Sequence, residues 1–282
     1  MTWKRKLIRL VALGVAAYLL IVIALVGFES KLVYPAPQYP SGDWNAEQYG
    51  AIDIRLQSSD SVTIHGWYYR LEQADGALLF CHGNAEHVAH NGEFGNHLAV
   101  ATNCNVFVFD YRGYGRSTGA PNEAGVLADA ETAVQWLAEE NGIEPAQVIV
   151  FGRSLGGGVA CHLVDKYGTR GLILQSTFSS MVDTAGSHYP CFPVKLVMRN
   201  RYNSVLRLKD YHGPLLQIHG SVDRVIPIAI GRRLFDSVES GKKSFVVLDG
   251  LGHNNVPADL AVAQIVPFVR ALNAQPTRSP LP

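Results

Sequence analysis

The chain opens on one long apolar block and then alternates short apolar runs with amphipathic segments. Residues 10–28 carry no charged side chain, whereas from residue 76 onward the apolar runs are short: GALLFC, NVFVFD, QVIVFG, GLILQS, PLLQIHG and KSFVVLDG. Such runs are typical of strands buried on both faces. The segments between them have helical periodicity, over residues 86–101, 122–140, 227–238 and 256–272 and from Leu155 onward. Short strands that alternate with helices predict an α/β fold, with a mostly parallel sheet covered on both faces.

Two features interrupt this alternation. Near the start, AIDIRLQ and VTIHGWYYR are separated by SSDS, which predicts an antiparallel opening hairpin. In residues 176–213 the alternation of strands and helices stops. This segment is long enough for a short lid but too short for a separate cap domain. One domain over residues 50–272 therefore accounts for the folded part, with 273–282 as a flexible tail. The lid carries apolar side chains that either line a pocket for an apolar group or cover the end of the sheet: Tyr189, Phe192, Leu196, Val197 and Met198.

The apolar block predicts a single transmembrane helix. As a helix, residues 10–28 rise by about 28 Å, which is close to the thickness of the hydrocarbon core of a bilayer. A signal peptide has a similar arrangement of basic and apolar regions, but the following ALVGFES contains no A-x-A cleavage motif. We therefore favour an uncleaved anchor.

The charges on the two sides of the block predict its orientation. Residues 1–9 hold four basic side chains, whereas Lys31 alone follows closely after the block. The positive-inside bias then places the N-terminus in the cytoplasm and the folded domain outside it, in the periplasm if the cell is bacterial. Residues 29–49 are rich in proline, which predicts an extended spacer between the anchor and the domain.

Composition narrows the function further. The chain has 24 basic and 24 acidic side chains and no net charge, so it predicts no nucleic-acid partner. Its four cysteines are too few and too scattered for a disulfide framework. The sequence contains no C-x-x-C pair, so it does not predict a structural zinc site. Polar residues of the 86–101 helix recur at the spacing of metal ligands without defining a quartet, and we expect an exposed polar face there: Glu86, His87, His90, Glu93 and His97.

The segment QVIVFGRSLGGGV places one serine, Ser154, between a strand and a helix. Gly152 and Gly156 flank it in a G-x-S-x-G pattern, because the sharp turn leaves no room for a Cβ at either position. No lysine follows the glycines as in a phosphate-binding loop, and no G-x-G opens the segment as in a dinucleotide fingerprint. Ser154 is therefore the candidate nucleophile, and the N–H of Leu155 at the helix start is a candidate oxyanion donor.

A nucleophilic serine needs a histidine base and an acid that orients the histidine. In this fold the acid and then the histidine follow the serine, each at the carboxyl end of a strand. Asp223 follows the run PLLQIHG, and His253 follows the run FVVLDG. Asp249 lies on the same loop as His253 and is expected to shape its turn, and Asp110 on an earlier strand is a weaker alternative acid.

A second oxyanion donor is expected from the loop after the strand GALLFC. That loop reads HGNAEH, where Gly83 allows a close backbone approach and the N–H of Asn84 can face the site. His82 is expected to stabilise this loop. Arg153 and Tyr111 are expected to be structural partners near the mouth of the site.

Five motifs together resemble the alpha/beta-hydrolase superfamily over about residues 50–272: FCHGNAE, FDYRGYGRSTG, FGRSLGGGVA, IHGSVDRVIP and GLGHNN. They are similar to a branch of N-terminally anchored or membrane-associated serine hydrolases that includes depalmitoylase-like enzymes. The resemblance implies the alpha/beta-hydrolase fold and assigns a role to each candidate residue: Ser154 as nucleophile, Asp223 as acid, His253 as base, and Asn84 and Leu155 as oxyanion donors. The chain departs from the pattern at Ser221, where relatives often carry an acidic residue, and this removes an alternative acid.

We therefore expect a cofactor-free hydrolase of acyl esters or thioesters, with a lipid-like substrate delivered from the membrane. Esters are favoured over peptides because the chain has no propeller or large cap that would select a peptide. A peptidase or amidase of the same fold is the near alternative. A binding scaffold without turnover and a perhydrolase or haloperoxidase-like side activity are further alternatives, which activity measurements distinguish.

Overall fold

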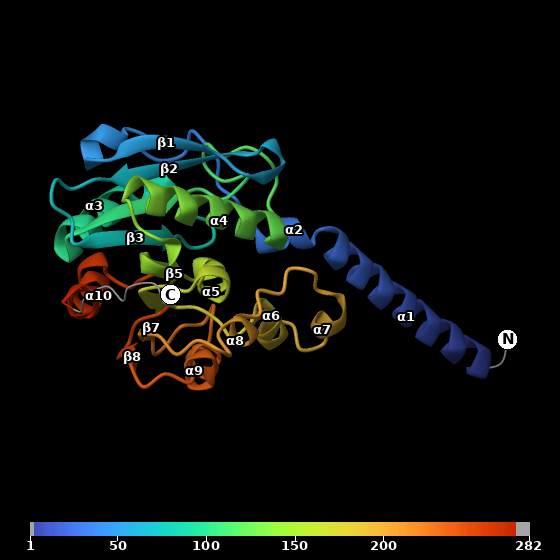
Figure 1. The fold of residues 1–282 in the computed structure, drawn as a ribbon. Helices are drawn as coiled ribbons and strands as arrows, with labels where there is room; N and C mark the ends of the chain where they lie inside the picture. Colours follow the sequence, from blue (N-terminus) through green and yellow to red (C-terminus); the bar gives the residue numbers. More distant parts are fainter. Residues whose placement is uncertain (1–2, 275–282) are drawn as a thin grey trace.

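An eight-stranded sheet runs through the computed structural model, which describes residues 3–274 (Figure 1). The strand order is β1-β2-β4-β3-β5-β6-β7-β8, in which β2 runs antiparallel to both of its neighbours and all the other pairs are parallel. The predicted α/β fold and its opening hairpin are confirmed. The strands are β1 (Ile52–Gln57), β2 (Thr63–Tyr69), β3 (Gly76–Cys81), β4 (Cys104–Phe109), β5 (Ile149–Arg153), β6 (Gly171–Gln175), β7 (Leu215–Gly220) and β8 (Lys243–Leu248).

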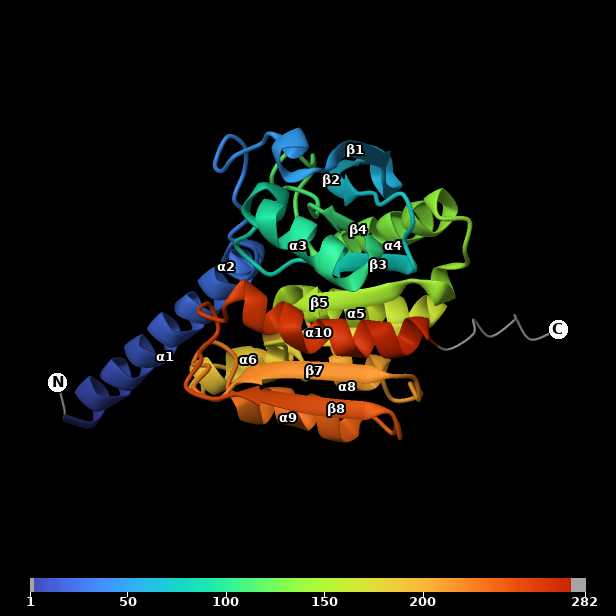
Figure 2. The same ribbon diagram turned by 90° about the vertical axis from the view of Figure 1, so that its left-hand side faces the viewer.

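Helices cover both faces of the sheet (Figure 2). In β3, Leu78 and Phe80 join one core cluster while Leu79 and Cys81 join the other, because successive side chains of a strand point to opposite faces. The first cluster lies under α3 (Gly92–Thr102) and α10 (Ala258–Asn273), and the second lies under α4 (Glu123–Glu140), α5 (Leu155–Tyr167) and α9 (Ile228–Ser237).

Most predicted helices begin and end within two residues of the observed ones, and the helix predicted over 86–101 is the exception. There, α3 begins only at Gly92, after a short 3-10 turn over Val88–Asn91. The backbone N–H of Val88 donates to the buried carboxylate of Asp110 at 2.8 Å, which holds this stretch against β4 instead of in a helix. Other 3-10 turns cover Ala46–Tyr49, Ser59–Ser61 and Pro145–Gln147.

The segment that interrupts the alternation lies between β6 and β7. It forms three short helices, α6 (Met181–His188), α7 (Val194–Val197) and α8 (Ser204–Arg207). The first two lie beside the end of the N-terminal helix, at the carboxyl end of the sheet (Figure 1). The position of this segment is that expected of a lid.

The N-terminal helix α1 (Trp3–Gly27) projects away from the sheet and includes the predicted span up to Gly27 (Figure 1). It is long and apolar enough to cross a membrane. The predicted extended spacer differs from the structure, because helix α2 (Glu29–Val33) follows at once and packs on the domain. Glu29 and Tyr34 are both buried there, since each finds hydrogen-bond partners on the lid segment. The part of the predicted tail beyond residue 274 lies outside the described residues.

Candidate active site

Ser154 lies on the turn between β5 and α5, in a backbone conformation that side chains rarely adopt. Its φ is 53° and its ψ is −117°. Two hydrogen bonds hold this turn: the N–H of Ser154 donates to the carbonyl of Gln175 at 2.9 Å, and the hydroxyl of Thr177 donates to the carbonyl of Ser154 at 2.8 Å. The turn is therefore fixed by the neighbouring strand β6 and the loop after it.

The two glycines of the turn are required by close backbone approaches. A Cβ at Gly152 would overlap the backbone of Gly156 and Gly157, and a Cβ at Gly156 would overlap the carbonyl oxygen of Cys81 in β3. The backbone of a buried central strand cannot shift to make room. Gly156 thus holds the start of α5 against the end of β3.

Replacing Gly156 by alanine is expected to lower the free energy of unfolding by about 3 kcal/mol, because the added methyl group overlaps buried backbone. Urea unfolding of the full chain in detergent micelles measures this. Gly186→Ala is the control, since that glycine is also helical and nothing lies within 4 Å of an added Cβ. The Gly186→Ala substitution is expected to raise the free energy of unfolding by roughly 0.5–1 kcal/mol. Equal effects of the two substitutions would contradict the prediction.

The structure brings Ser154, His253 and Asp223 together at the carboxyl ends of β5, β8 and β7. Nε2 of His253 lies 2.9 Å from Oγ of Ser154, and Nδ1 lies 2.8 Å from Oδ2 of Asp223. A carboxylate only accepts hydrogen bonds, so Nδ1 of His253 carries the proton and Nε2 is left to accept from the serine hydroxyl. This is the arrangement in which a histidine can remove a proton from a serine.

Asp223 is held in its ionised form. Burial raises the pKa of its carboxyl group, but hydrogen bonds from His219 and His253 and the backbone N–H of Ile226 outweigh burial and bring the pKa well below its usual range. Oδ1 accepts from the N–H groups of Val225 and Ile226 at 2.9 and 2.8 Å, which leaves Oδ2 directed at His253. The loop after β7 therefore orients the carboxylate as well as charging it.

Of the predicted oxyanion donors, Leu155 directly follows Ser154 and Asn84 lies on the loop after β3. An added Cβ at Gly83 would lie 3.6 Å from Cβ of Ser154, so the loop that carries Asn84 passes close to the serine. Within residues 3–274, the backbone N–H groups of Asn84 and Leu155 donate to no protein acceptor. Both are available to a bound oxygen atom.

The side chain of Asn84 tethers its loop. Its Nδ2 donates to the carbonyl of Val33 at 2.6 Å, and its Oδ1 accepts from the hydroxyl of Tyr114 at 2.6 Å. The loop that carries the expected oxyanion donor is therefore held from one side by the end of α2. The sequence analysis did not anticipate this contact between the N-terminal segment and the site.

Similarity to known proteins agrees with this geometry. A family model described as serine aminopeptidase, S33, matches residues 72–206. The alpha/beta hydrolase domain-containing protein WAV2 of Arabidopsis thaliana is 33% identical over 231 residues, which cover 73% of this chain and 74% of the relative. The chain belongs to the alpha/beta-hydrolase superfamily. The chain is also 30% identical over 265 residues to the protein bem46 of Schizosaccharomyces pombe, over 86% of each chain.

Solved structures show the same alpha/beta-hydrolase fold. The Pyrococcus furiosus esterase Pf2001 aligns with a TM-score of 0.68 at 17% identity, over 84% of this chain and 98% of that one. Acetyl xylan esterase 1 of Thermoanaerobacterium aligns with a TM-score of 0.61 at 19% identity, over 77% and 83% of the two chains. At these identities the likeness is one of fold.

The two alternative acids, Asp110 and Asp249, have other partners. Asp110 is buried, accepts from the N–H of Val88 and lies 3.5 Å from both His65 and His82. Burial raises the pKa of Asp110, and hydrogen bonds from the two histidines outweigh it and lower the pKa. Asp249 accepts from the hydroxyl of Ser221 at 2.9 Å and shapes the turn before His253. Both acids stabilise loops around the site.

A polar cavity of about 320 Å³ lies beside His253. Arg153 lines it and donates to Glu86 and to Oδ1 of Asn91, while its guanidinium packs over the ring of Phe94. Burial raises the pKa of Glu86, but its interactions with Arg153, His82 and Asn91 together outweigh burial and lower the pKa. The sequence analysis treated Glu86 as part of an exposed helix face, because nothing in the local pattern links it to the residue before the serine.

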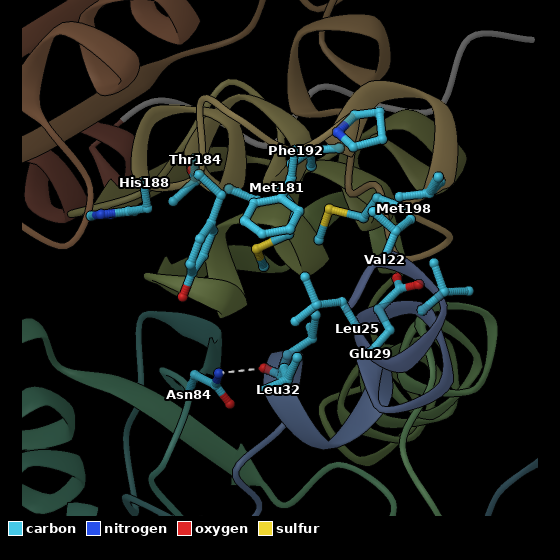
Figure 3. A pocket seen from close by; sticks show the side chains of 17 residues that line it. Val22, Leu25, Glu29, Leu32, Asn84, Met181, Thr184, His188, Phe192 and Met198 are labelled. Carbon is cyan, nitrogen blue, oxygen red and sulfur yellow. Dashed lines mark hydrogen bonds between the residues drawn. The ribbon is translucent and has the colours of Figure 1, made fainter. Parts of the chain in front are cut away.

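A second cavity, which is apolar, lies on the side of Asn84 (Figure 3). Its volume is about 350 Å³. The lid contributes four of the five predicted pocket residues: Tyr189, Phe192, Val197 and Met198. Leu196 does not line the cavity and is 85% exposed. The opposite wall comes from α1 and α2, which the sequence analysis had assigned to an anchor and a spacer.

Proposed function

We propose that this protein is a membrane-anchored serine hydrolase that cleaves carboxylic ester or thioester bonds. The observation that carries the proposal is the position of His253, which is hydrogen-bonded to the hydroxyl of Ser154 on one side and to the ionised Asp223 on the other. A serine with such a base becomes a nucleophile at neutral pH. No cofactor is needed for this reaction.

The proposed reaction proceeds in two halves. As Oγ of Ser154 bonds to the substrate carbonyl carbon, Nε2 of His253 takes the hydroxyl proton, and the carbonyl electron pair moves to oxygen. The backbone N–H groups of Asn84 and Leu155 stabilise this oxyanion. When the tetrahedral intermediate collapses, the leaving alcohol or thiol takes the proton from His253. Water then repeats the sequence on the acyl-enzyme and releases the carboxylic acid.

The proposal places α1 in a membrane. The helix is long and apolar enough to span it, and the basic residues before the span favour a cytoplasmic N-terminus with the hydrolase domain on the other side. An acyl substrate with a membrane-bound chain, as in the depalmitoylase-like branch, would reach the apolar cavity beside Asn84 from that side. The domain boundaries given above, with the hydrolase domain over residues 50–272, belong to the same proposal.

The test is covalent labelling of the full chain in detergent micelles by a fluorophosphonate probe. We expect one labelled peptide, with the modification on Ser154, and we expect prior treatment with a short-chain ester to slow the labelling. The full chain is required because Glu29 and Tyr34 pack on the lid. A folded protein that the probe does not label, or labels elsewhere, would overturn the proposal and leave a binding scaffold.

A peptidase is the second candidate, because the matching family model is described as a serine aminopeptidase. The same catalytic residues can open an amide bond. A panel of aminoacyl amides and acyl esters separates the two. Higher kcat/KM for the amides would replace the esterase by the peptidase.

A further inference from the structure

The apolar cavity has two walls that are far apart in the sequence (Figure 3). One wall comes from the last turns of α1 and from α2, including Val22, Leu25 and Leu32. The other comes from the lid, including Met181, Phe192 and Met198. Its volume of about 350 Å³ is within the range of small-molecule sites, which is roughly 300–1,000 Å³. Neither wall encloses this space alone, so the N-terminal helix is part of the cavity.

Polar contacts fix the N-terminal wall against the lid. The carboxylate of Glu29, which is 6% exposed, accepts from the backbone N–H groups of Arg199 and Asn200 at 2.9 and 2.7 Å and from Nδ2 of Asn200 at 2.8 Å. The hydroxyl of Tyr18 donates to the carbonyl of Cys191 at 3.0 Å. These bonds orient α1 relative to the domain, which a simple anchor does not require.

The charged carboxylate of Glu29 is taken up by hydrogen bonds to the lid segment. Burial raises the pKa of its carboxyl group, and hydrogen bonds from Asn200 and Arg199 outweigh burial and lower the pKa. His188, which also lines the cavity, forms a hydrogen bond with the carbonyl of Val225 at 2.8 Å. The cavity therefore offers its occupant an apolar surface, on which a hydrocarbon chain is the best fit.

One end of the cavity reaches the loop that carries a proposed oxyanion donor, and the other reaches the membrane-spanning part of the chain. Asn84, whose N–H is a proposed oxyanion donor, lines the first end and donates from Nδ2 to Val33 in the N-terminal wall. Val22 and Leu25 line the other end and belong to the apolar block of residues 10–28. An acyl chain in the cavity would thus run from the site toward the bilayer along α1.

We propose that this cavity binds the acyl chain of a long-chain ester or thioester, and that α1 forms one wall of the substrate site in addition to anchoring the protein. The inference rests on the proposed function, since it names the substrate class of the same site. It predicts that a side chain on α1 controls the chain-length preference of the hydrolase.

The test compares acetate, octanoate and palmitate esters of one alcohol, using the full chain in lipid nanodiscs. The two matched variants are Val22→Trp, at a position that lines the cavity, and Ile23→Trp, at the next position of α1, which is 66% exposed and does not line it. In the wild type, kcat/KM is expected to rise with chain length by up to about fourfold for each methylene group that the cavity buries. Val22→Trp is expected to lower the palmitate-to-acetate ratio of kcat/KM by about tenfold or more, because it excludes several methylene groups. Ile23→Trp is expected to keep the wild-type ratio.

The outcomes separate the inference from the proposed function. Ester hydrolysis with the same chain-length ratio in the wild type and both variants would overturn the inference and leave the proposed function standing. If the wild type hydrolyses none of the esters, the proposed function fails and the inference fails with it.

A second measurement does not depend on the folding of a variant. A palmitoyl fluorophosphonate with a diazirine at the chain end reacts with Ser154 and, after illumination, crosslinks to whatever surrounds the chain. Crosslinks are expected within residues 18–33 and 181–198. Crosslinks within residues 86–94 or 256–261, at the polar cavity, would overturn the inference.

Discussion

Replacing Ser154 by alanine is expected to lower kcat for ester hydrolysis by about 10⁶-fold, which is the loss that follows when a triad nucleophile is removed. The expectation follows from geometry, because Oγ of Ser154 is the group that His253 holds at 2.9 Å. Alanine keeps the backbone bonds of the turn to Gln175 and Thr177, so the fold is expected to persist. Steady-state kinetics of ester hydrolysis measure the loss of kcat, and thermal unfolding of the same preparation tests whether the fold persists.

The control for this substitution is Ser240→Ala. Ser240 lies before β8, at the end of the sheet away from His253, and its hydroxyl donates to the carbonyl of Gly213 at 2.7 Å. The kcat of the Ser240→Ala variant is expected to equal that of the wild type. A Ser154→Ala variant that keeps more than about one hundredth of the wild-type kcat would contradict the assignment of the nucleophile, because that loss is far smaller than a triad serine causes.

Replacing Asp223 by asparagine is expected to lower kcat by about 10⁴-fold. Asparagine can donate a hydrogen bond where the carboxylate only accepts, so it allows Nδ1 of His253 to become the acceptor and places the proton on Nε2, facing Ser154. The wild-type pKa of Asp223 lies below the ordinary value of 3.8, so its carboxylate is ionised throughout the neutral and alkaline range. Titration of this carboxylate therefore adds no pH dependence to the wild-type kcat across that range.

Asp249→Asn is the matched control for the acid. Asp249 accepts from Ser221 and lies on the loop of His253, so a general effect of removing a negative charge near the site appears in both variants. We expect Asp249→Asn to stay within about threefold of the wild type, since one hydrogen bond on an exposed loop contributes about 0.5 kcal/mol. A large loss of kcat in Asp249→Asn together with a small loss of kcat in Asp223→Asn would show that Asp249, and not Asp223, is the acid that orients His253.

The lowered pKa of Asp223 also affects stability. A depressed pKa in the folded state contributes stability above the unfolded value of about 3.9 and loses it as the pH falls through the folded value. The hydrogen bond between Asp223 and His253 is therefore intact throughout the neutral pH range. Acidification acts on the site through groups other than this carboxylate.

Local patterns of the chain were sufficient for most of the fold. The short apolar runs predicted the parallel strands β3 to β8, because the strands of a sheet covered on both faces are mostly apolar. The G-x-S-x-G segment predicted the turn at Ser154, because only glycine fits against the neighbouring backbone at positions 152 and 156. Chain order then selected Asp223 and His253, and the structure places both beside Ser154. Their catalytic roles remain predictions.

The errors occurred where a segment depends on a distant partner. Residues 29–49 were predicted to be an extended spacer from their prolines, yet Glu29 is buried because the backbone of Arg199 and Asn200 satisfies its carboxylate. The helix predicted from residue 86 begins at Gly92, because Asp110 binds the backbone of Val88. In both places a hydrogen bond across more than twenty residues outweighs local propensity.

By itself, the sequence determined the sheet, the turn of the serine, the order of the three candidate catalytic residues and an apolar N-terminal helix. These features depend on periodicity, on the size of single residues and on chain order, all of which can be read locally. Only the tertiary structure decided that α1 and the lid enclose a cavity next to Asn84, and that Arg153 faces Glu86. The physical reason is that a cavity or a buried ion pair exists only where surfaces from distant segments meet, and no local pattern records which surfaces those are.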